Sequence, residues 1–262
     1  MKFIKLGSTD MSVSCVGLGT VKFGRNQGVK YPQAFELPSD KAIQELLACA
    51  QDLGINLLDT APAYGISEER LGKIVKNRKE WIVCTKAGEE FVDGDSVYEF
   101  SPEKIRKSVE RSLQRLKTDY LDIVLVHSNG DDKKIIEEDG ALQMLAELKK
   151  AGLIRAFGMS TKTIDGGMLA VDQSDVVMVT YNPVNPEDRP VIAHAHEKKK
   201  GIFIKKALAS GHLDKISKED PVMAAMQFIF QEPGVTSVIL GTLSPNHLKH
   251  NVECAVQALI PA

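Results

Sequence analysis

Short apolar runs rich in β-branched residues alternate along this chain with longer segments whose apolar residues recur every three or four positions. A run of the first kind predicts a buried strand, and a segment of the second kind predicts an amphipathic helix. Their regular alternation is typical of consecutive βα units around a parallel sheet. The predicted strands are Cys15–Gly19, Ile55–Asp59, Trp81–Lys86, Tyr120–His127, Ile154–Ser160, Val176–Thr180, Ile202–Lys206 and Thr236–Leu240.

Eight strands close a (β/α)8 TIM barrel, a fold that commonly takes about 250 residues. Because the chain has 262 residues, we expect one α/β barrel domain over residues 1–262. Ahead of the first unit, Phe3–Leu6 and Met11–Ser14 flank the polar turn Gly7–Asp10. This pattern predicts an N-terminal β-hairpin, which would plug the floor of the barrel.

Start and stop signals place the outer helices. Ser39 is expected to cap a helix that Gly54 ends. The same type of start signal recurs at Ser101-Pro102, Asp220-Pro221 and Ser244-Pro245. Three connections that follow strands are long, and loops of that length are usually lids or binding loops. They are Val21–Pro38, Ala87–Phe100 and Ala207–Glu219, all expected on the active-site face.

Composition narrows the class of protein. Charged residues make up 26% and hydrophobic residues 43% of the chain, which is an ordinary globular balance, and the net charge is −2. We therefore expect neither nucleic acid nor a membrane as a partner. The four cysteines form no Cys-x-x-Cys pair and no apolar run approaches about 18 residues. A cytoplasmic protein with reduced thiols is expected, and no sequence feature specifies an oligomeric state.

Asp59, Tyr64, Lys86 and His127 each lie at or just after the end of a predicted strand, where a barrel of this kind gathers its active site. Tyr64 can act as the acid that protonates a carbonyl oxygen if a neighbouring positive charge assists it. Lys86 can supply that charge, and Asp59 can keep it cationic. His127 can orient the substrate oxygen. Together these residues predict reduction of a carbonyl group, without need of a metal.

The segment Gly54–Lys73, which reads GINLLDTAPAYGISEERLGK, resembles the signature of the aldo-keto reductase superfamily. Further matches are Thr85-Lys86, Val126-His127-Ser128, Gly158-Met159-Ser160, Tyr181-Asn182-Pro183 and Gly241-Thr242 through Asn251. The resemblance implies a (β/α)8 barrel that binds NADP(H) in extended form. It also implies a small-molecule aldehyde or ketone as the substrate and Tyr64 as the acid.

The resemblance also implies the residues that bind the cofactor. Gly19, Thr20 and Asp59 would lie at the nicotinamide end, where Ser160 would bind the carboxamide and Thr161 and Met178 occupy the adjoining family positions. Below the pyrophosphate would lie Lys205, Lys206, Ala207, Leu208, Ser210 and Gly211. The adenosine end would be held by Gly241, Thr242, Leu243, His247, His250 and Asn251, at the start of a helix whose dipole favours phosphate.

Several positions depart from the family pattern. The family often has Asn at position 161 and Gln at position 178, where this chain has Thr161 and Met178. Gly241, Leu243 and His247 provide no cation for a 2′-phosphate. NADPH is therefore the expected cofactor with NADH as an alternative. Because the chain ends shortly after its last helix, we expect an open, permissive substrate site.

Other functions have weaker support. The altered Thr161 and Met178 positions would also suit a sensor or partner subunit that binds the cofactor with little turnover. Lys205 or Lys86 could act as a Schiff-base lysine in a barrel aldolase. That function would leave unexplained the grouping of Asp59, Tyr64 and His127, which with Lys86 we call the tetrad.

Three short motifs have simpler interpretations than a functional site. Lys22 replaces the glycine that a Gly-x-Gly-x-x-Gly fingerprint needs after Gly17-Leu18-Gly19. His194, His196 and Glu197 are expected on a surface helix without a converging third metal ligand. The acidic segments Asp93–Asp95 and Asp131-Asp132 are expected to be loop tips, since calcium loops need further ligands.

Overall fold

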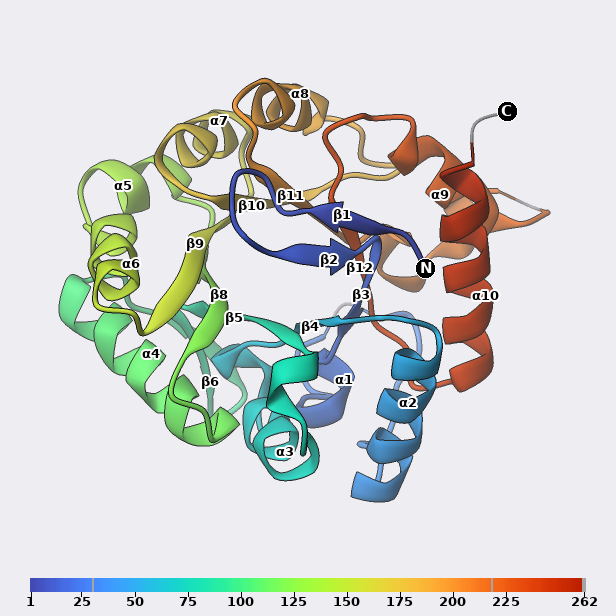
Figure 1. Cartoon of the computed structure of the whole chain (residues 1–262), viewed down its shortest axis with the longest axis horizontal. Coiled ribbons are helices and arrows are strands. Elements are labelled where there is room, and N and C mark those ends of the chain that lie inside the picture. The colour runs from blue at the N-terminus through green and yellow to red at the C-terminus, as the bar shows by residue number, and fades with distance from the viewer. Residues whose placement is uncertain (30, 218, 261–262) are drawn as a thin grey trace.

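Eight parallel strands close into a barrel in the computed structural model, which describes residues 1–29, 31–217 and 219–260 (Figure 1). The strands are β3 (Val16–Gly19), β4 (Leu57–Asp59), β5 (Ile82–Ala87), β8 (Leu121–His127), β9 (Ile154–Ser160), β10 (Val176–Thr180), β11 (Gly201–Lys205) and β12 (Ser237–Leu240). Their order around the barrel is β10-β11-β12-β3-β4-β5-β8-β9. The predicted (β/α)8 fold is confirmed, and each strand begins and ends within two residues of its prediction.

Helices surround the barrel (Figure 1). They are α1 (Val21–Gly24), α2 (Asp40–Asp52), α3 (Ser67–Ile74), α4 (Pro102–Leu116), α5 (Asp132–Glu137), α6 (Ala141–Lys150), α7 (Ile164–Gln173), α8 (Arg189–Glu197), α9 (Pro221–Phe230) and α10 (Pro245–Ala258). None of the helices within the described ranges is both long and apolar enough to cross a membrane.

Two apolar cores result, because successive side chains of a strand point to opposite faces. Leu57 of β4 and Ile123 of β8 point into the barrel and belong to the inner core. Their neighbours Leu58 and Val124 face outward into the larger core beneath the helices. Both faces of each strand are therefore buried, which explains why the strands appear in the sequence as nearly continuous apolar runs.

Side-chain caps begin several of the helices as predicted. Ser39 accepts a hydrogen bond from the backbone N–H of Ala42, and Ser244 accepts one from that of His247. Asp220 accepts two, from Val222 and Met223. The predicted cap at Ser101 is wrong. Ser101 precedes Pro102 at the start of α4, but its side chain makes no capping hydrogen bond with the described residues. The fixed backbone angle of Pro102 remains as the local signal for that helix start.

The predicted N-terminal hairpin is present and closes one end of the barrel (Figure 1). Strands β1 (Phe3–Lys5) and β2 (Ser12–Ser14) pair antiparallel. Leu6, Met11 and Val13 are buried and belong to the inner core. Because β3 starts directly after β2, the hairpin covers the amino ends of the barrel strands. The carboxyl ends, at the opposite mouth, remain open.

Most of the segment Ala87–Phe100, predicted to be a long loop, forms a second hairpin. Strand β6 (Glu89–Val92) pairs antiparallel with β7 (Asp95–Tyr98). Asp93 and Gly94 form the two-residue turn with φ values of 51° and 95°. Asp-Gly is the dipeptide that such turns favour. The Asp93–Asp95 segment is thus the tip of a hairpin at the carboxyl-end mouth of the barrel.

The other two long connections also contain short helical turns. Helix α1 lies in the first of them. The connection after β11 contains the 3₁₀ turns η3 (Ala209–Gly211) and η4 (Leu213–Lys215).

Two glycines let α1 pack closely against the turn that carries Tyr64. Gly65 has a φ of +60°, and a Cβ built on it would lie 2.2 Å from the carbonyl oxygen of Gly24. A Cβ on Gly24 would lie 2.3 Å from the carbonyl oxygen of Tyr64. Both distances are too short for any side chain, so this close contact fixes where the Tyr64 turn lies.

Replacing Gly65 with alanine is expected to lower the free energy of unfolding by about 2–4 kcal/mol, because left-handed strain is combined with overpacking. Urea denaturation measures the change. Gly152→Ala is the matched control, since Gly152 has a φ of +78° and a Cβ added there would meet no atom within 4 Å. Strain alone should cost about 1 kcal/mol in that variant. Equal losses in the two variants would contradict the importance of the contact.

Candidate active site

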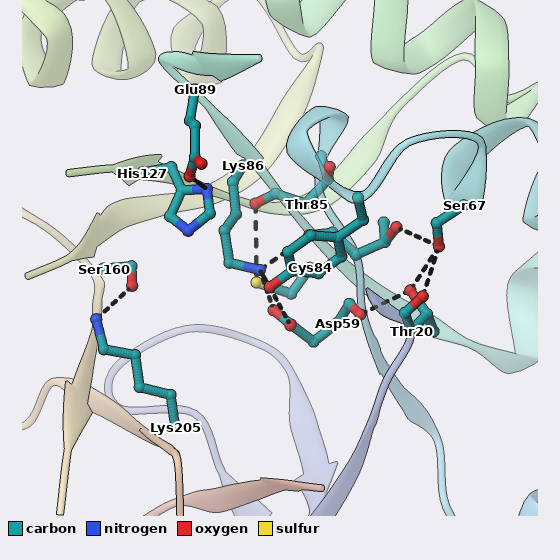
Figure 2. A network of polar contacts seen from close by, with 12 residues as sticks. Thr20, Asp59, Ser67, Cys84, Thr85, Lys86, Glu89, His127, Ser160 and Lys205 are labelled. Carbon is teal, nitrogen blue, oxygen red and sulfur yellow. Dashed lines mark hydrogen bonds and ion pairs between the residues drawn. The ribbon is translucent and has the colours of Figure 1, made fainter. Parts of the chain in front are cut away.

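Four polar side chains meet at the carboxyl ends of neighbouring barrel strands. Asp59 ends β4, Lys86 lies near the end of β5 and His127 ends β8. Tyr64 ends the 3₁₀ turn η1 (Pro62–Tyr64) that follows β4. Lys86 Nζ donates to Asp59 Oδ1 at 2.6 Å and to Tyr64 Oη at 3.1 Å (Figure 2). The fold therefore assembles the residues that the sequence analysis selected.

Lys86 remains charged although it is buried. Its residue is 1% exposed, and Nζ also donates to the backbone oxygen of Thr60 at 2.9 Å. Burial acts to lower the pKa of Lys86, but the Asp59 carboxylate and then Tyr64 outweigh it, so the pKa is raised. Burial and Asp59 also raise the pKa of Tyr64, and Lys86 offsets only part of that rise. Tyr64 accordingly keeps its proton near neutral pH.

Glu89 contacts His127, and sequence reasoning did not identify it. Its Oε2 lies 2.7 Å from His127 Nδ1 (Figure 2), and its Oε1 accepts a hydrogen bond from Ser96 Oγ. Burial acts to raise the pKa of Glu89, but His127 and Ser96 lower it to about 2. Burial lowers the pKa of His127, whereas Glu89 opposes that shift. The sequence signal that could have revealed this contact is the dipeptide Asp93-Gly94. It predicts a hairpin turn, and the hairpin places Glu89 at the barrel mouth.

The tetrad opens into a cavity of about 680 Å³, and all four residues line it. Residues assigned to the cofactor by resemblance also line it: Gly19, Asp59, Ser160, Met178, Lys205, Lys206, Ala207, Leu208, Ser210, Gly211 and Gly241. Others lie outside this lining, namely Thr20, Thr161, Thr242, Leu243, His247, His250 and Asn251. Thr20 is fully buried, and its hydroxyl donates to the backbone oxygen of Asp59 at 2.9 Å.

Lys205 reaches across to the end of β9. Its Nζ donates to Ser160 Oγ at 2.8 Å (Figure 2). It also donates to the backbone oxygen of Thr161 at 2.6 Å. Burial, followed by the charge of neighbouring Lys206, lowers the pKa of Lys205 to about 7. The Oγ1 atom of Thr161 is buried and has no hydrogen-bond partner within the part of the chain that the structure describes.

These residues fit a nicotinamide dinucleotide. The cavity has more basic lining residues, Lys22, Arg25, Lys86, Lys162, Lys205 and Lys206, than acidic ones, Asp59 and Glu89. A pyrophosphate requires such local positive charge because the net charge of the chain is −2. Ser160 lines the same cavity, and its hydroxyl can hydrogen-bond a carboxamide.

The start of α10 adjoins this cavity through Gly241. Asn251 is buried in the first turns of the helix, whereas His247 and His250 are exposed. His250 Nε2 lies 3.5 Å from Asp220 Oδ1 and 3.6 Å from Cys254 Sγ. These three residues are the group among the described residues that could hold a metal ion, with ligand atoms within 4.8 Å of one another. The Asp220 Oδ1 atom already accepts two backbone hydrogen bonds in capping α9.

His194 pairs with an aspartate on another helix rather than with His196 or Glu197. Its Nε2 lies 2.8 Å from Asp172 Oδ1 on the neighbouring helix α7. The pair therefore links two outer helices.

Comparisons with known proteins agree with this geometry. The model of the aldo/keto reductase family matches residues 15–224. The uncharacterized oxidoreductase YqkF of Bacillus subtilis is 29% identical over 97% of this chain and 91% of its own length. The NADH-specific methylglyoxal reductase of Escherichia coli is 32% identical over 70% of this chain and 59% of its own length.

A solved structure of a Pseudomonas aeruginosa protein described as an aldo-keto reductase has a TM-score of 0.90 and 50% sequence identity. The match covers 98% of this chain and 96% of that one. The family match extends over most of the barrel and includes all four tetrad residues. The chain therefore belongs to the aldo/keto reductase family, a family of oxidoreductases.

Proposed function

We propose that this protein reduces aldehydes or ketones to alcohols, with NAD(P)H as the hydride source and Tyr64 as the proton donor. The observation that carries the proposal is the Asp59–Lys86–Tyr64 chain of hydrogen bonds at the wall of a cavity that fits the cofactor. A bound nicotinamide cofactor supplies the hydride. The protein must hold the carbonyl, donate a proton to its oxygen and exclude water.

Tyr64 Oη is the acid in this scheme. A carbonyl oxygen gains negative charge as the hydride arrives, and a nearby N–H or O–H donor stabilises that charge. Lys86 donates to Tyr64 Oη and therefore stabilises the phenolate that remains when the proton leaves. Asp59 keeps Lys86 positively charged before and after that step.

Glu89 acts as a positioning residue through His127. Because a carboxylate only accepts hydrogen bonds, a neutral His127 with Nδ1 against Glu89 carries its proton on Nδ1. The other ring nitrogen, which faces away from Glu89 (Figure 2), then has a free lone pair. Only a protonated His127 presents an N–H to the carbonyl oxygen. The protonated form thus serves reduction, and the neutral form suits binding of the alcohol.

The nicotinamide end would lie against Gly19, Ser160 and Met178, and the pyrophosphate against the connection after β11 with its lysines. We propose NADPH as the cofactor, in keeping with the family. NADH is the second candidate, since Gly241, Leu243 and His247 provide no cation for a 2′-phosphate and one relative is an NADH-specific enzyme.

We further propose that residues 1–262 form one domain that acts in the cytoplasm. All four cysteines are free, which suits a reducing compartment. Small carbonyl compounds are the proposed substrates, because the cavity also has to hold the nicotinamide end of the cofactor.

Titration with NADPH and with NADH should show saturable binding of at least one of them, since the cavity supplies both cations and carboxamide partners. Enhancement of the fluorescence of the reduced nicotinamide measures the binding. Turnover is then assayed with the tighter cofactor on a panel of aldehydes and ketones. If neither cofactor binds, the proposed function is wrong, and binding without turnover would exclude the reductase activity.

Tyr64→Phe is expected to lower kcat by about 100-fold or more, because it removes the acid but keeps the ring. The Kd of the cofactor should change less than about twofold, since the hydroxyl acts on the substrate oxygen. Steady-state kinetics and cofactor fluorescence measure the two effects. Tyr120→Phe, at the residue before β8 and so at the opposite end of the strand from His127, is the control for a lost tyrosine hydroxyl. Retained turnover in Tyr64→Phe would exclude Tyr64 as the acid.

Reduction should slow as pH rises through the pKa of His127, and Glu89→Gln should move this decline to lower pH, because Glu89 favours the charged histidine. At neutral pH we expect kcat to fall by about tenfold with little change in the Kd of the cofactor. The pH profile of kcat measures the shift. Glu89→Asp should restore part of it, and Glu90→Gln, whose partner is Arg111, should not reproduce it. An unshifted profile in Glu89→Gln argues against the positioning role.

A further inference from the structure

At the mouth of the barrel, the Lys205 side chain extends past one strand to the end of another. Strand β10 separates β11, which carries Lys205, from β9, which ends at Ser160. The Lys205 side chain nevertheless bonds Ser160 Oγ and the Thr161 oxygen. Ser160 in turn pairs in register with His127 of β8. Lys205 Nζ therefore lies at the tetrad side of the cavity rather than over the connection that follows its own strand.

We propose that Lys205 contacts the nicotinamide end of the cofactor and makes the protein bind the reduced form more tightly than the oxidised form. This inference rests on the proposed function and assigns Lys205 a place other than beneath the pyrophosphate. The two forms of the cofactor differ in the charge of the nicotinamide ring, and this difference is the same for NADPH and NADH.

The position of the reacting groups leads to this contact. A carbonyl whose oxygen meets Tyr64 and His127 must receive its hydride from a ring on the same side of the cavity. Ser160 and Met178 form the adjoining floor of that space. A ring held there lies within reach of Lys205 Nζ, which is already bonded to Ser160.

Charge then discriminates between the two forms. The oxidised nicotinamide ring carries a positive charge and the reduced ring is neutral, whereas the phosphates are the same in both. The partners of Lys205 are a hydroxyl and a carbonyl oxygen, so its positive charge is not neutralised by a bonded carboxylate. Like charges repel strongly in a partly desolvated cavity. Protonated Lys205 therefore penalises the oxidised ring alone.

The discrimination should depend on pH. Because the pKa of Lys205 is lowered to about 7, the amine loses its charge within the accessible pH range. Charged or titratable groups face it from each neighbouring element, namely Lys206 of its own segment, Lys162 after β9, Asp132 of α5, Asp188 before α8 and His127 of β8. Burial lowers the pKa of His127, which also lines the cavity, so Lys205 variants are needed to separate the effects of the two groups.

The test compares Lys205→Met with Lys206→Met. The Kd of the reduced cofactor is measured by its own fluorescence, and that of the oxidised cofactor by displacement of the reduced one at pH 6. Lys205→Met should shift the ratio of the two Kd values about tenfold toward the oxidised form, as expected when one unit charge near the ring is removed. Lys206→Met removes a charge from the same segment and should weaken both forms equally.

A pH series supplies the second measurement and needs no substitution. In the unsubstituted protein the preference for the reduced form should decline between pH 6 and 8, while Lys205→Arg should keep it and Lys205→Met should lack it throughout. A ratio unchanged by Lys205→Met, or one equally changed by Lys206→Met, would overturn the inference alone. Failure of the unsubstituted protein to bind either form would overturn the proposed function and the inference together.

Discussion

The buried ammonium of Lys86 is the constraint on which the arrangement of the active site depends. A charged group removed from water needs compensating partners, and loss of one partner from a buried pair is far more damaging than replacement of both. Asp59, the Thr60 carbonyl and Tyr64 Oη are those partners. Each lies on β4 or on the turn that follows it. Because β4 pairs with β5 in a fixed register, the charge is satisfied only when these two strands are correctly aligned.

The two ends of the barrel differ in composition: one is packed with apolar side chains and the other carries the polar side chains of the cavity. Apolar residues of the N-terminal hairpin, such as Leu6 and Val13, fill the end where the strands begin. At the other end polar side chains replace them, and the short contact between Gly24 and Gly65 holds the Tyr64 turn in place. The inner core therefore fixes the strands from one side, which leaves the opposite mouth free to carry polar groups that contribute little to packing.

Both the barrel and the tetrad could be predicted from the sequence because each has a local pattern along the chain. Buried parallel strands appear as short apolar runs, and Asp59, Lys86 and His127 mark the carboxyl ends of three of them. Contacts formed by side chains that extend from loops or across strands have no such local signature. Glu89 reaches His127 only because the segment after β5 folds into a hairpin. The family resemblance implies that Lys205 lies beneath the pyrophosphate. In the structure its amine is bonded to Ser160 at the end of β9.

Two lysines at the same mouth of the barrel show how the protein sets charge by choice of partner. Lys86 is buried and Lys205 is partly buried, and burial favours the neutral form of each. Lys86 is bonded to the Asp59 carboxylate, so its pKa is raised and its charge is permanent. Lys205 is bonded to a hydroxyl and a carbonyl, and nearby Lys206 opposes its charge, so its pKa is lowered to about 7. The permanent charge suits the group that supports Tyr64. The variable charge suits the place we propose for Lys205, beside a ring whose own charge changes with the reaction.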